Sequence, residues 1–189
     1  MNQIYANSIA KAKSYYKDFG DILHDLSHTV RVAENAAEIA KSLGYKDLDF
    51  LELCVYWHDV ARTQNIEPHE EPSAATARDD LLARGADQEV ANLVYEAIRF
   101  HKSTANPTIV EGKIIRDADK LDIFSVIRWR NCVKAGKLED YAEELRKTID
   151  NLYKYPDALT YDYTKKLYKE RFPKFWEYYE SIKGQLPAA

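Results

Sequence analysis

Ionisable side chains stand on the apolar stripes of three predicted helices, and this placement limits the folds that are open to the chain. The polar residues and their apolar neighbours at helical spacing are Asp119 with Ile115, Ile123 and Val126, His58 with Leu51 and Val55, and His28 with Val32, Ala36 and Ile39. A buried carboxylate costs free energy unless it is paired or coordinates a cation. Polar groups that face inward from several helices therefore predict a shared partner in the core of a helical bundle. A divalent metal ion is the leading candidate for that partner.

Almost every segment of the 189-residue chain repeats its apolar residues at helical period, and no stretch alternates like a strand for long. With 46% hydrophobic residues, the chain can bury a full core as one domain. Periodicity, together with the glycines and prolines that bound it, predicts helices over about 3–18, 21–43, 47–62, 72–84, 87–101 and 110–135. We therefore predict an all-α fold, a single-domain helical bundle over residues 1–189.

The last third of the chain, about residues 137–189, differs from the rest in its aromatic content. Its aromatic residues include Tyr141, Tyr153, Tyr155, Tyr161, Tyr163, Tyr168, Trp176, Tyr178 and Tyr179. One interpretation is two or three amphipathic helices that cover the bundle through aromatic contacts. The other interpretation is that this segment forms a lid or the contact surface of a homodimer. Under either interpretation, this segment is a tyrosine-rich helical extension of the domain.

The formal net charge of −4 argues against a general nucleic-acid binder, because such proteins neutralise phosphates with Lys and Arg. The two cysteines, Cys54 and Cys132, fit neither a disulfide framework nor a CxxC metal site. The N-terminal sequence MNQIYANSIAKAKSYY lacks the apolar segment of a signal peptide. No apolar run approaches the roughly 20 residues of a membrane span. We expect a cytoplasmic protein with no membrane partner, in which local basic groups can still hold a small phosphate.

The candidate metal ligands are imidazoles and carboxylates, without a thiolate. This set suits Mn, Fe, Co, Ni, Zn or Mg better than copper or a structural zinc site. His58 and Asp59 are adjacent, and at the end of a helix two neighbouring side chains can both reach one ion. A single HisAsp dipeptide arises by chance in many proteins. The complete spaced set is much more specific.

This spaced set resembles the HD superfamily of metal-dependent phosphohydrolases. The first histidine stands in HisThrValArgVal (28–32), the signature pair in TyrTrpHisAspValAlaArg (56–62), and the final aspartate in IleIleArgAspAlaAspLysLeuAsp (114–122). The resemblance covers roughly residues 21–135 and implies a helical bundle of the HD-domain type. It also implies that His28, His58, Asp59 and Asp119 bind one metal ion.

Two further histidines suggest a second metal ion. Some members of the superfamily carry two extra histidines between the HisAsp pair and the last aspartate, and these hold a second metal. His69 precedes a helix that contains SerAlaAla (73–75), and His101 follows AlaIleArgPhe (97–100), so both contexts are similar to those positions. With two metals, Asp59 is expected to bridge them. The alternative is that His101 contacts the substrate phosphate and His69 is a loop histidine.

Three more polar residues lie near the proposed ligands. His24, one helical turn before His28, either supports the site or is an exposed or capping histidine, and the second interpretation is favoured. Asp122 shares the helix face of Asp119 and is placed to orient a ligand imidazole or a bound water. Asp117 points elsewhere on the helix and is expected to be a surface or capping residue.

Phosphoester chemistry also needs positive charge near the metal. The basic residues within three or four positions of a proposed ligand are Arg31, Arg62, Lys102 and Lys120. We expect these residues to bind the substrate phosphate, with Arg31 ranked last because a single basic residue is more often a solvated helix charge. Hydrolysis would proceed by attack of metal-bound water, whose pKa falls on coordination. Asp59, Arg62 and Lys120 are the predicted catalytic residues.

The resemblance therefore favours hydrolysis of a phosphoester or phosphoanhydride in a nucleotide or another small phosphorylated metabolite. Two alternatives stay open. A minority of the superfamily uses a dinuclear iron site for oxygen-dependent oxidation, and a six-ligand set is compatible with that chemistry. The other alternative is a nucleotide-sensing module that keeps the metal pocket but does not catalyse a reaction. Three candidates remain for the group that donates a proton to the leaving group, namely Asp59, His101 and water.

Overall fold

The computed structural model describes residues 2–102 and 105–187. The α-helices are α1 (Gln3–Tyr15), α2 (Leu26–Ser42), α3 (Leu48–Trp57), α4 (Glu70–Ala83), α5 (Gln88–Arg99), α6 (Val110–Ile123), α7 (Val126–Lys134), α8 (Ala142–Asp150), α9 (Tyr155–Ala158) and α10 (Asp162–Ile182). The 3₁₀ segments are η1 (Val60–Gln64), η2 (Leu152–Lys154) and η3 (Lys183–Gln185). None of the described residues forms a strand, which confirms the predicted all-α fold. Within those residues, no helix is long and apolar enough to cross a membrane.

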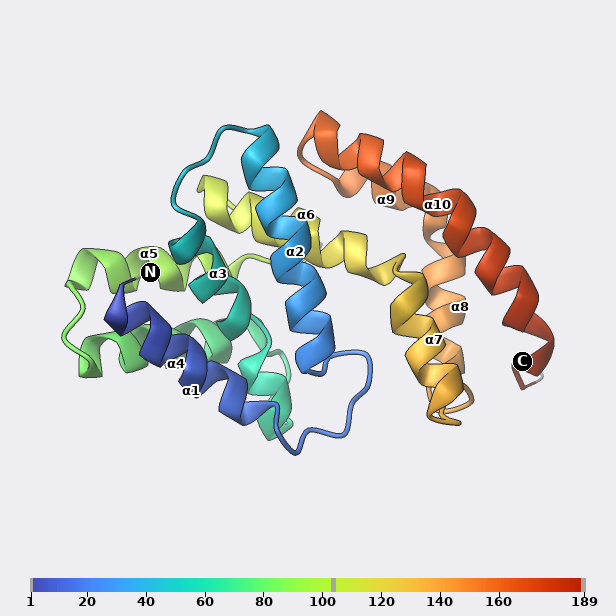
Figure 1. The fold of residues 1–189 in the computed structure, drawn as a ribbon, viewed down its shortest axis with the longest axis horizontal. Coiled ribbons are helices and arrows are strands. Elements are labelled where there is room, and N and C mark those ends of the chain that lie inside the picture. The colour runs from blue at the N-terminus through green and yellow to red at the C-terminus, as the bar shows by residue number, and fades with distance from the viewer. Residues whose placement is uncertain (1, 103–104, 188–189) are drawn as a thin grey trace.

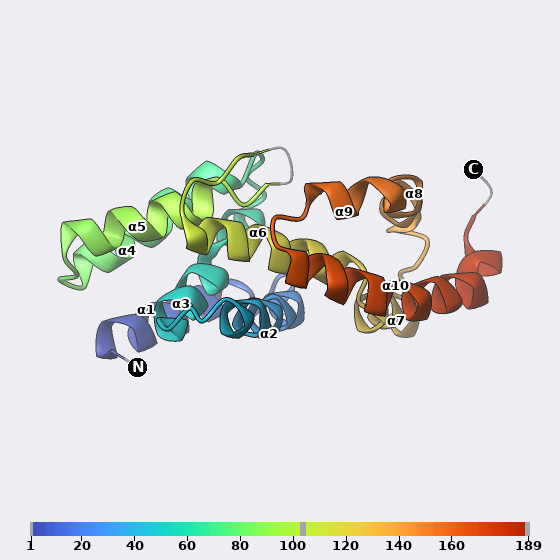
Figure 2. The ribbon, with the colours of Figure 1, turned by 90° about the horizontal axis from the view of Figure 1, so that it is seen from above.

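Helix α6 runs through the middle of the molecule and connects its two halves (Figure 1). On one side, α2 packs on α3 and α6, and α4 packs on α5. On the other side, α10 packs along α6, α7 and α2. Figure 2 shows the elongated outline of the chain, with the two termini at opposite ends. Buried side chains from both halves, such as Trp57, Ile115 and Phe175, belong to one hydrophobic cluster.

The start of α2 lies later than the periodicity predicts, at Leu26 instead of near Asp21. Asp25 is the N-cap, and its carboxylate accepts the backbone N–H of His28 at 2.9 Å. Asp21 belongs to a separate turn, where it accepts the N–H of Leu23 at 2.9 Å. Two capping aspartates therefore divide this segment, and His28 falls in the first turn of α2.

The end of α3 is the second difference from the prediction, because the helix stops at Trp57 rather than near residue 62. Asp59 has φ −111° and ψ 9°, outside the helical region, and the chain continues as η1. In a continuous helix, adjacent side chains point about 100° apart. The break lets two neighbours converge, so that Nε2 of His58 and Oδ2 of Asp59 lie 3.5 Å apart.

The predicted helix over 110–135 is two helices, α6 and α7, that meet at Phe124. The rings around Phe124 are those of Tyr155, Tyr168 and Phe175, at centroid distances of 5.0, 4.9 and 5.5 Å. This packing against the aromatic extension outweighs the helical propensity of the segment. Trp129 donates its indole N–H to the carbonyl of Ile123 at 3.0 Å, so the broken helix end keeps a hydrogen-bond partner.

Asp117 is buried, although the sequence predicts a surface or capping residue. Its carboxylate accepts the backbone N–H of Thr160 at 3.0 Å and that of Tyr161 at 3.2 Å, just before α10 begins. Arg116 donates to the hydroxyl of Thr160 at 2.6 Å. These contacts fasten the start of α10 to α6. They join residues far apart in the chain, which helical periodicity cannot reveal.

Candidate metal centre

The structure brings the six predicted metal ligands together in one cluster. They are His28 in α2, His58 and Asp59 at the end of α3, His69 before α4, His101 after α5, and Asp119 in α6. The four histidines and Asp59 are buried, and the side chain of Asp119 is 24% exposed. The cluster is therefore inside the bundle, with Asp119 as its most exposed member.

Asp59 lies at the centre of the cluster and directs one carboxylate oxygen to each pair of histidines. Its Oδ2 lies 3.6 Å from Nε2 of His28 and 3.5 Å from Nε2 of His58. Its Oδ1 lies 2.9 Å from Nε2 of His69 and 3.6 Å from Nε2 of His101. Two groups of ligand atoms result, and Asp59 belongs to both. A carboxylate shared in this way is placed to bridge two cations.

Asp119 lies beside the group formed by His28, His58 and Asp59, since its Oδ1 lies 3.5 Å from Nε2 of His28. The nitrogen–oxygen distances in this group, 3.5–3.6 Å, are too long for hydrogen bonds. They are close to the separation of two ligand atoms that each lie roughly 2.1 Å from a common ion.

Each of the four imidazoles is held by a hydrogen bond from Nδ1. The acceptors are the Asp122 carboxylate for His28 at 2.7 Å, the Val55 carbonyl for His58 at 2.6 Å, the Glu67 carboxylate for His69 at 3.0 Å, and the Ile98 carbonyl for His101 at 2.6 Å. None of these acceptors has a proton to give, so we assign a proton to every Nδ1. Nε2 of each ring is therefore the nitrogen that is available to bind a metal ion in the cluster. Histidines that bind metals typically have this arrangement.

Nε2 of His28 and Nε2 of His58 are buried, and neither has a hydrogen-bond partner among the described residues. A buried polar atom without a partner costs about 1–3 kcal/mol. A cation bound to both nitrogens would remove this cost. Imidazole and carboxylate ligands suit several divalent metals. The residues present therefore fit a divalent metal ion.

The charges of the cluster also favour a cation. Burial opposes the charged form of His28, but the hydrogen bond to Asp122 and the nearby carboxylate of Asp59 outweigh burial and raise its pKa to about 9. Burial lowers the pKa of His58 to about 4, so this ring is neutral at pH 7. Burial likewise opposes the Asp59 carboxylate, but the surrounding histidines hold its pKa well below the usual range. When only protein groups are present, the carboxylates favour a proton on His28. A bound metal ion would supply the positive charge in place of that proton.

A cavity of about 270 Å³ opens beside Asp59 and Asp119. Three of the four basic residues expected to bind phosphate line it, namely Arg62, Lys102 and Lys120. Lys120 is only 3% exposed, and burial lowers its pKa. Its ammonium group therefore lies in a site that is partly shielded from water, where an anionic partner would be held strongly.

The other two of these three basic residues, Arg62 and Lys102, are already paired. Arg62 donates to Asp59 at 3.2 Å and to Glu67 at 2.5 Å. Lys102 is exposed and lies 3.3 Å from the carboxylate of Glu70. Both remain at the cavity wall, but a bound phosphate would compete with these carboxylates for them.

Arg31 lines a neighbouring cavity instead of this one. Its guanidinium donates to both carboxylate oxygens of Asp122, at 2.6 and 3.0 Å, and to the hydroxyl of Ser27 at 2.9 Å. Asp122 in turn accepts Nδ1–H of His28, so it orients the imidazole of a proposed ligand, one of the two roles expected for it. The structure therefore places Arg31 behind the cluster, as a support for Asp122.

Sequence reasoning missed several residues of the cavity wall. Arg128 is buried, lines the cavity and donates to Asp122 at 3.2 Å. It follows Asp122 by six residues across the break between α6 and α7, so no helical spacing points to it. Tyr155 and Glu144 line the same cavity from the C-terminal extension. Glu67 stands two residues before His69, a proximity that could have suggested it.

His24 also lines the cavity and is half-buried. It directly precedes Asp25, the N-cap of α2, so it lies in the cap region but is not an exposed residue. Its Nδ1 lies 2.7 Å from the Asp21 carboxylate, and its ring centroid lies 5.6 Å from that of His28. Burial lowers the pKa of His24. The Asp21 contact orients the imidazole and leaves Nε2 for a ligand in the cavity.

The chain is similar to known proteins in its sequence and in its fold. The HD-domain family model matches residues 25–123. The crystal structure of a predicted HD superfamily hydrolase from an uncultured Thermotogales bacterium is similar, with a TM-score of 0.68, 27% identity, and 95% of this chain and 91% of that chain covered. Bacillus subtilis YpgQ, solved in complex with ADP, has a TM-score of 0.67 and 22% identity over 98% of both chains, which shows a shared fold. A search of curated proteins found no match.

Proposed function

The chain belongs to the HD-domain family, since the family model covers more than half of its length, and we propose that it is a metal-dependent phosphohydrolase. The proposed reaction is cleavage of a phosphoester or phosphoanhydride bond in a nucleotide or another small phosphorylated metabolite. The likeness to a predicted HD superfamily hydrolase supports hydrolysis in general.

The position of Asp59 between two pairs of imidazoles is the observation that carries this proposal. Its two oxygens face different histidine pairs, and Asp119 lies beside one of the two groups, 3.5 Å from His28. We propose His28, His58, Asp59 and Asp119 as the ligands of one divalent ion, and His69 and His101, with Asp59, as those of a second. Bound metal would supply an activated water and polarise the phosphoryl oxygens.

The cations of the cavity are proposed to hold the phosphoryl group. Lys120 and Arg62 flank Asp59 and Asp119, so they would contact phosphoryl oxygens and stabilise the charge that develops on them during cleavage. Lys102, which is exposed, would contact a more distant part of the substrate. His24 is held by Asp21 at the same wall, and its doubly protonated form, the minor form at pH 7 because burial lowers its pKa, is proposed to donate the proton of Nε2 to the leaving oxygen and so become neutral.

Basic residues at the cavity favour hydrolysis of a phosphate over the two alternatives. Activation of dioxygen does not itself use cations such as Lys120 and Arg62, whereas phosphoryl transfer does. A silent nucleotide sensor would not need the complete set of ligand atoms that is found around Asp59. Nucleotides are the first substrates to test, because the B. subtilis protein of the same fold was solved with ADP.

The decisive experiment combines metal analysis with a substrate screen of the full chain. Purified protein is analysed for bound metal and then assayed with nucleotides and sugar phosphates in the presence of Mn, Co, Ni or Mg. We expect metal-dependent release of phosphate or pyrophosphate from at least one nucleotide. The Asp119→Ala variant is the control and should release neither.

Two results would overturn the proposal. Iron-dependent oxygen consumption without phosphate release would assign the oxygenase chemistry. Tight nucleotide binding without turnover under any of the metals would assign the sensing module.

A further inference from the structure

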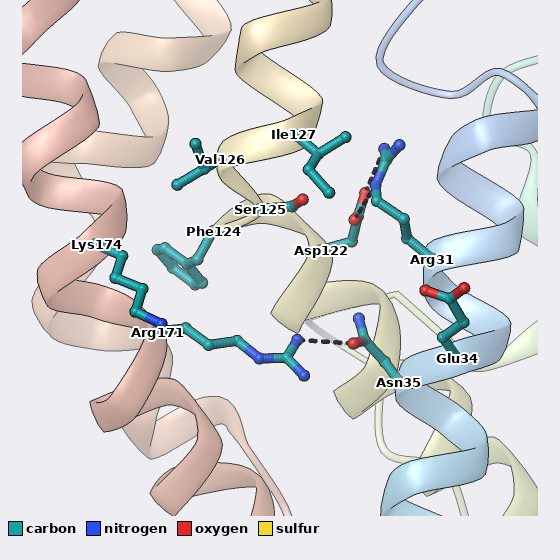
Figure 3. A pocket seen from close by; sticks show the side chains of 10 residues that line it. All are labelled: Arg31, Glu34, Asn35, Asp122, Phe124, Ser125, Val126, Ile127, Arg171 and Lys174. Atoms are coloured by element: carbon teal, nitrogen blue, oxygen red, sulfur yellow. Dashed lines mark hydrogen bonds and ion pairs between the residues drawn. The ribbon is translucent and has the colours of Figure 1, made fainter.

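A second cavity, of about 320 Å³, lies behind the candidate metal centre, between the HD core (about residues 21–135) and the C-terminal extension (about 137–189). Figure 3 shows its walls: α2 on one side, the junction of α6 and α7 in the middle, and α10 on the other side. Asp122 lines this cavity and also accepts Nδ1–H of His28, so the two sites share one carboxylate. Cavities of this size at the joint between structural units are common places for small ligands.

Three basic side chains stand on two walls of this cavity. Arg31 projects from α2, and Arg171 and Lys174 project from α10 (Figure 3). Arg171 already donates to Asn35 at 2.7 Å and to Glu38 at 3.0 Å. No ion pair joins the exposed Lys174 to another described residue. Lys174 is therefore the cation that is free to take an anionic ligand.

The carboxylates of the cavity differ in their availability. Asp122 is compensated by Arg31, Arg128 and His28, so it adds little negative potential. Glu34 is exposed on α2, and no hydrogen bond joins it to another described residue. A ligand that reaches both walls would meet a cation at Lys174 and a hydrogen-bond acceptor at Glu34.

The first turn of α7 adds hydrogen-bond donors to the same wall. Ser125, Val126 and Ile127 line the cavity, and Ser125, the N-cap of α7, makes no side-chain capping bond. The first N–H groups of a helix have no acceptor within the helix. They and the Ser125 hydroxyl therefore supplement Lys174 as donors to anionic oxygens.

We propose that this cavity binds a small molecule with a phosphate or carboxylate group at one end and hydroxyl or amino donors at the other. The anionic group contacts Lys174 and the start of α7, and the donors contact Glu34. The site is separate from the metal cavity and does not depend on the proposed hydrolysis. In this proposal α10 contributes to ligand binding, because it carries Lys174.

The test is an NMR titration of the metal-free, ¹⁵N-labelled full chain with inorganic phosphate, acetate and ribose 5-phosphate. We expect saturable shifts of the Ser125, Val126 and Ile127 amides. Ribose 5-phosphate should bind more tightly than phosphate, because its hydroxyls can donate to Glu34. The acetate arm separates a carboxylate ligand from a phosphate ligand, since the better binder identifies the anionic group.

Two variants with a matched control make the result specific. Lys174→Glu should weaken phosphate binding roughly tenfold or more, because a charged hydrogen bond is typically worth about that factor. Lys169→Glu changes an exposed lysine of the same helix that does not line the cavity, and it should bind like the unmodified chain. Glu34→Gln should keep phosphate binding but lose the preference for ribose 5-phosphate.

The proposal is overturned if none of the three probes shifts these amides, or if Lys174→Glu binds as tightly as Lys169→Glu. Shifts confined to Asp59, Lys120 and their neighbours would assign all anion binding to the metal cavity and would likewise overturn it. The Asp119→Ala variant, which should lose metal and hydrolysis, should still bind at this second site. Failure of this proposal and failure of the proposed function are therefore distinguishable.

Discussion

The carboxylate of Asp122 accepts a 2.7 Å hydrogen bond from Nδ1 of His28, although the two residues are 94 positions apart. Both are buried, and Asp122 is itself held by Arg31 and Arg128. A carboxylate in this position fixes the imidazole ring and increases its basicity as a ligand. The geometry of the candidate metal centre therefore depends on residues that would not contact the metal.

The first prediction is that Asp122→Asn weakens metal binding roughly 10–100-fold, the usual effect of removing a group that orients a ligand. The amide keeps the size of the side chain but loses its charge. Competition with a chromogenic chelator measures the affinity, and circular dichroism checks the fold. Asp162→Asn, on the exposed start of α10, is the control and should bind metal normally. Equal affinities in the two variants would contradict the role of Asp122.

The second prediction is that His58→Ala and Asp119→Ala lose bound metal and keep most of their helix content. A ligand that binds only the folded state stabilises it, by about 2.7 kcal/mol at a concentration 100 times the dissociation constant. Added Mn should therefore raise the thermal midpoint of the unmodified chain but not that of either variant. Full metal occupancy in either variant would refute the ligand assignment.

The third prediction concerns the number of metal ions. If Asp59 bridges two ions, a crystal grown or soaked with metal should show them about 3.5–4 Å apart, the usual separation in two-metal hydrolytic sites. His101→Ala should then retain one ion per chain, because the group around His28 and Asp119 is untouched. One ion in the soaked, unmodified crystal, with His69 unbound, would establish a mononuclear centre.

Helical periodicity predicted the fold class and the approximate position of each helix in the HD core, because the apolar faces that form the core recur at helical spacing. It did not predict the break at Phe124. That break results from packing of its ring on Tyr155, Tyr168 and Phe175, which come from a distant segment. The buried role of Asp117 was missed for the same reason, since its partners are backbone N–H groups of residues 160 and 161.

The candidate site followed from residue type and order, because His and Asp on apolar helix faces are rare without a partner. Two features could not be predicted. The hydrogen bonds that orient His58 and His101 go to backbone carbonyls, which every residue has. The support of Asp122 by Arg128 depends on the angle between α6 and α7, which the sequence does not specify.

The fourth prediction is that Lys120→Ala keeps metal but lowers kcat/KM roughly 100-fold, the size of effect seen when a group that stabilises transition-state charge is removed. A fall in kcat would place Lys120 on the developing charge, whereas a rise in KM alone would mean equal binding of substrate and transition state. Lys46→Ala, at an exposed position, is the control. Unchanged kinetics would show that Lys120 does not contact the substrate.

The last prediction concerns His24, which lies at the cavity wall with Nδ1 held by Asp21. If its Nε2 donates a proton to the leaving oxygen, His24→Ala should keep metal and lower kcat roughly 100-fold, within the usual range for general acid catalysis. Asp21→Asn should lower kcat less, because the imidazole remains but is less well oriented. A substrate whose leaving group is already a good one, such as a nitrophenyl phosphate, needs no proton and should be cleaved almost equally by His24→Ala and the unmodified chain. An equal loss on both kinds of substrate would mean that His24 has a structural role, and the proton would then have to come from water or from His101.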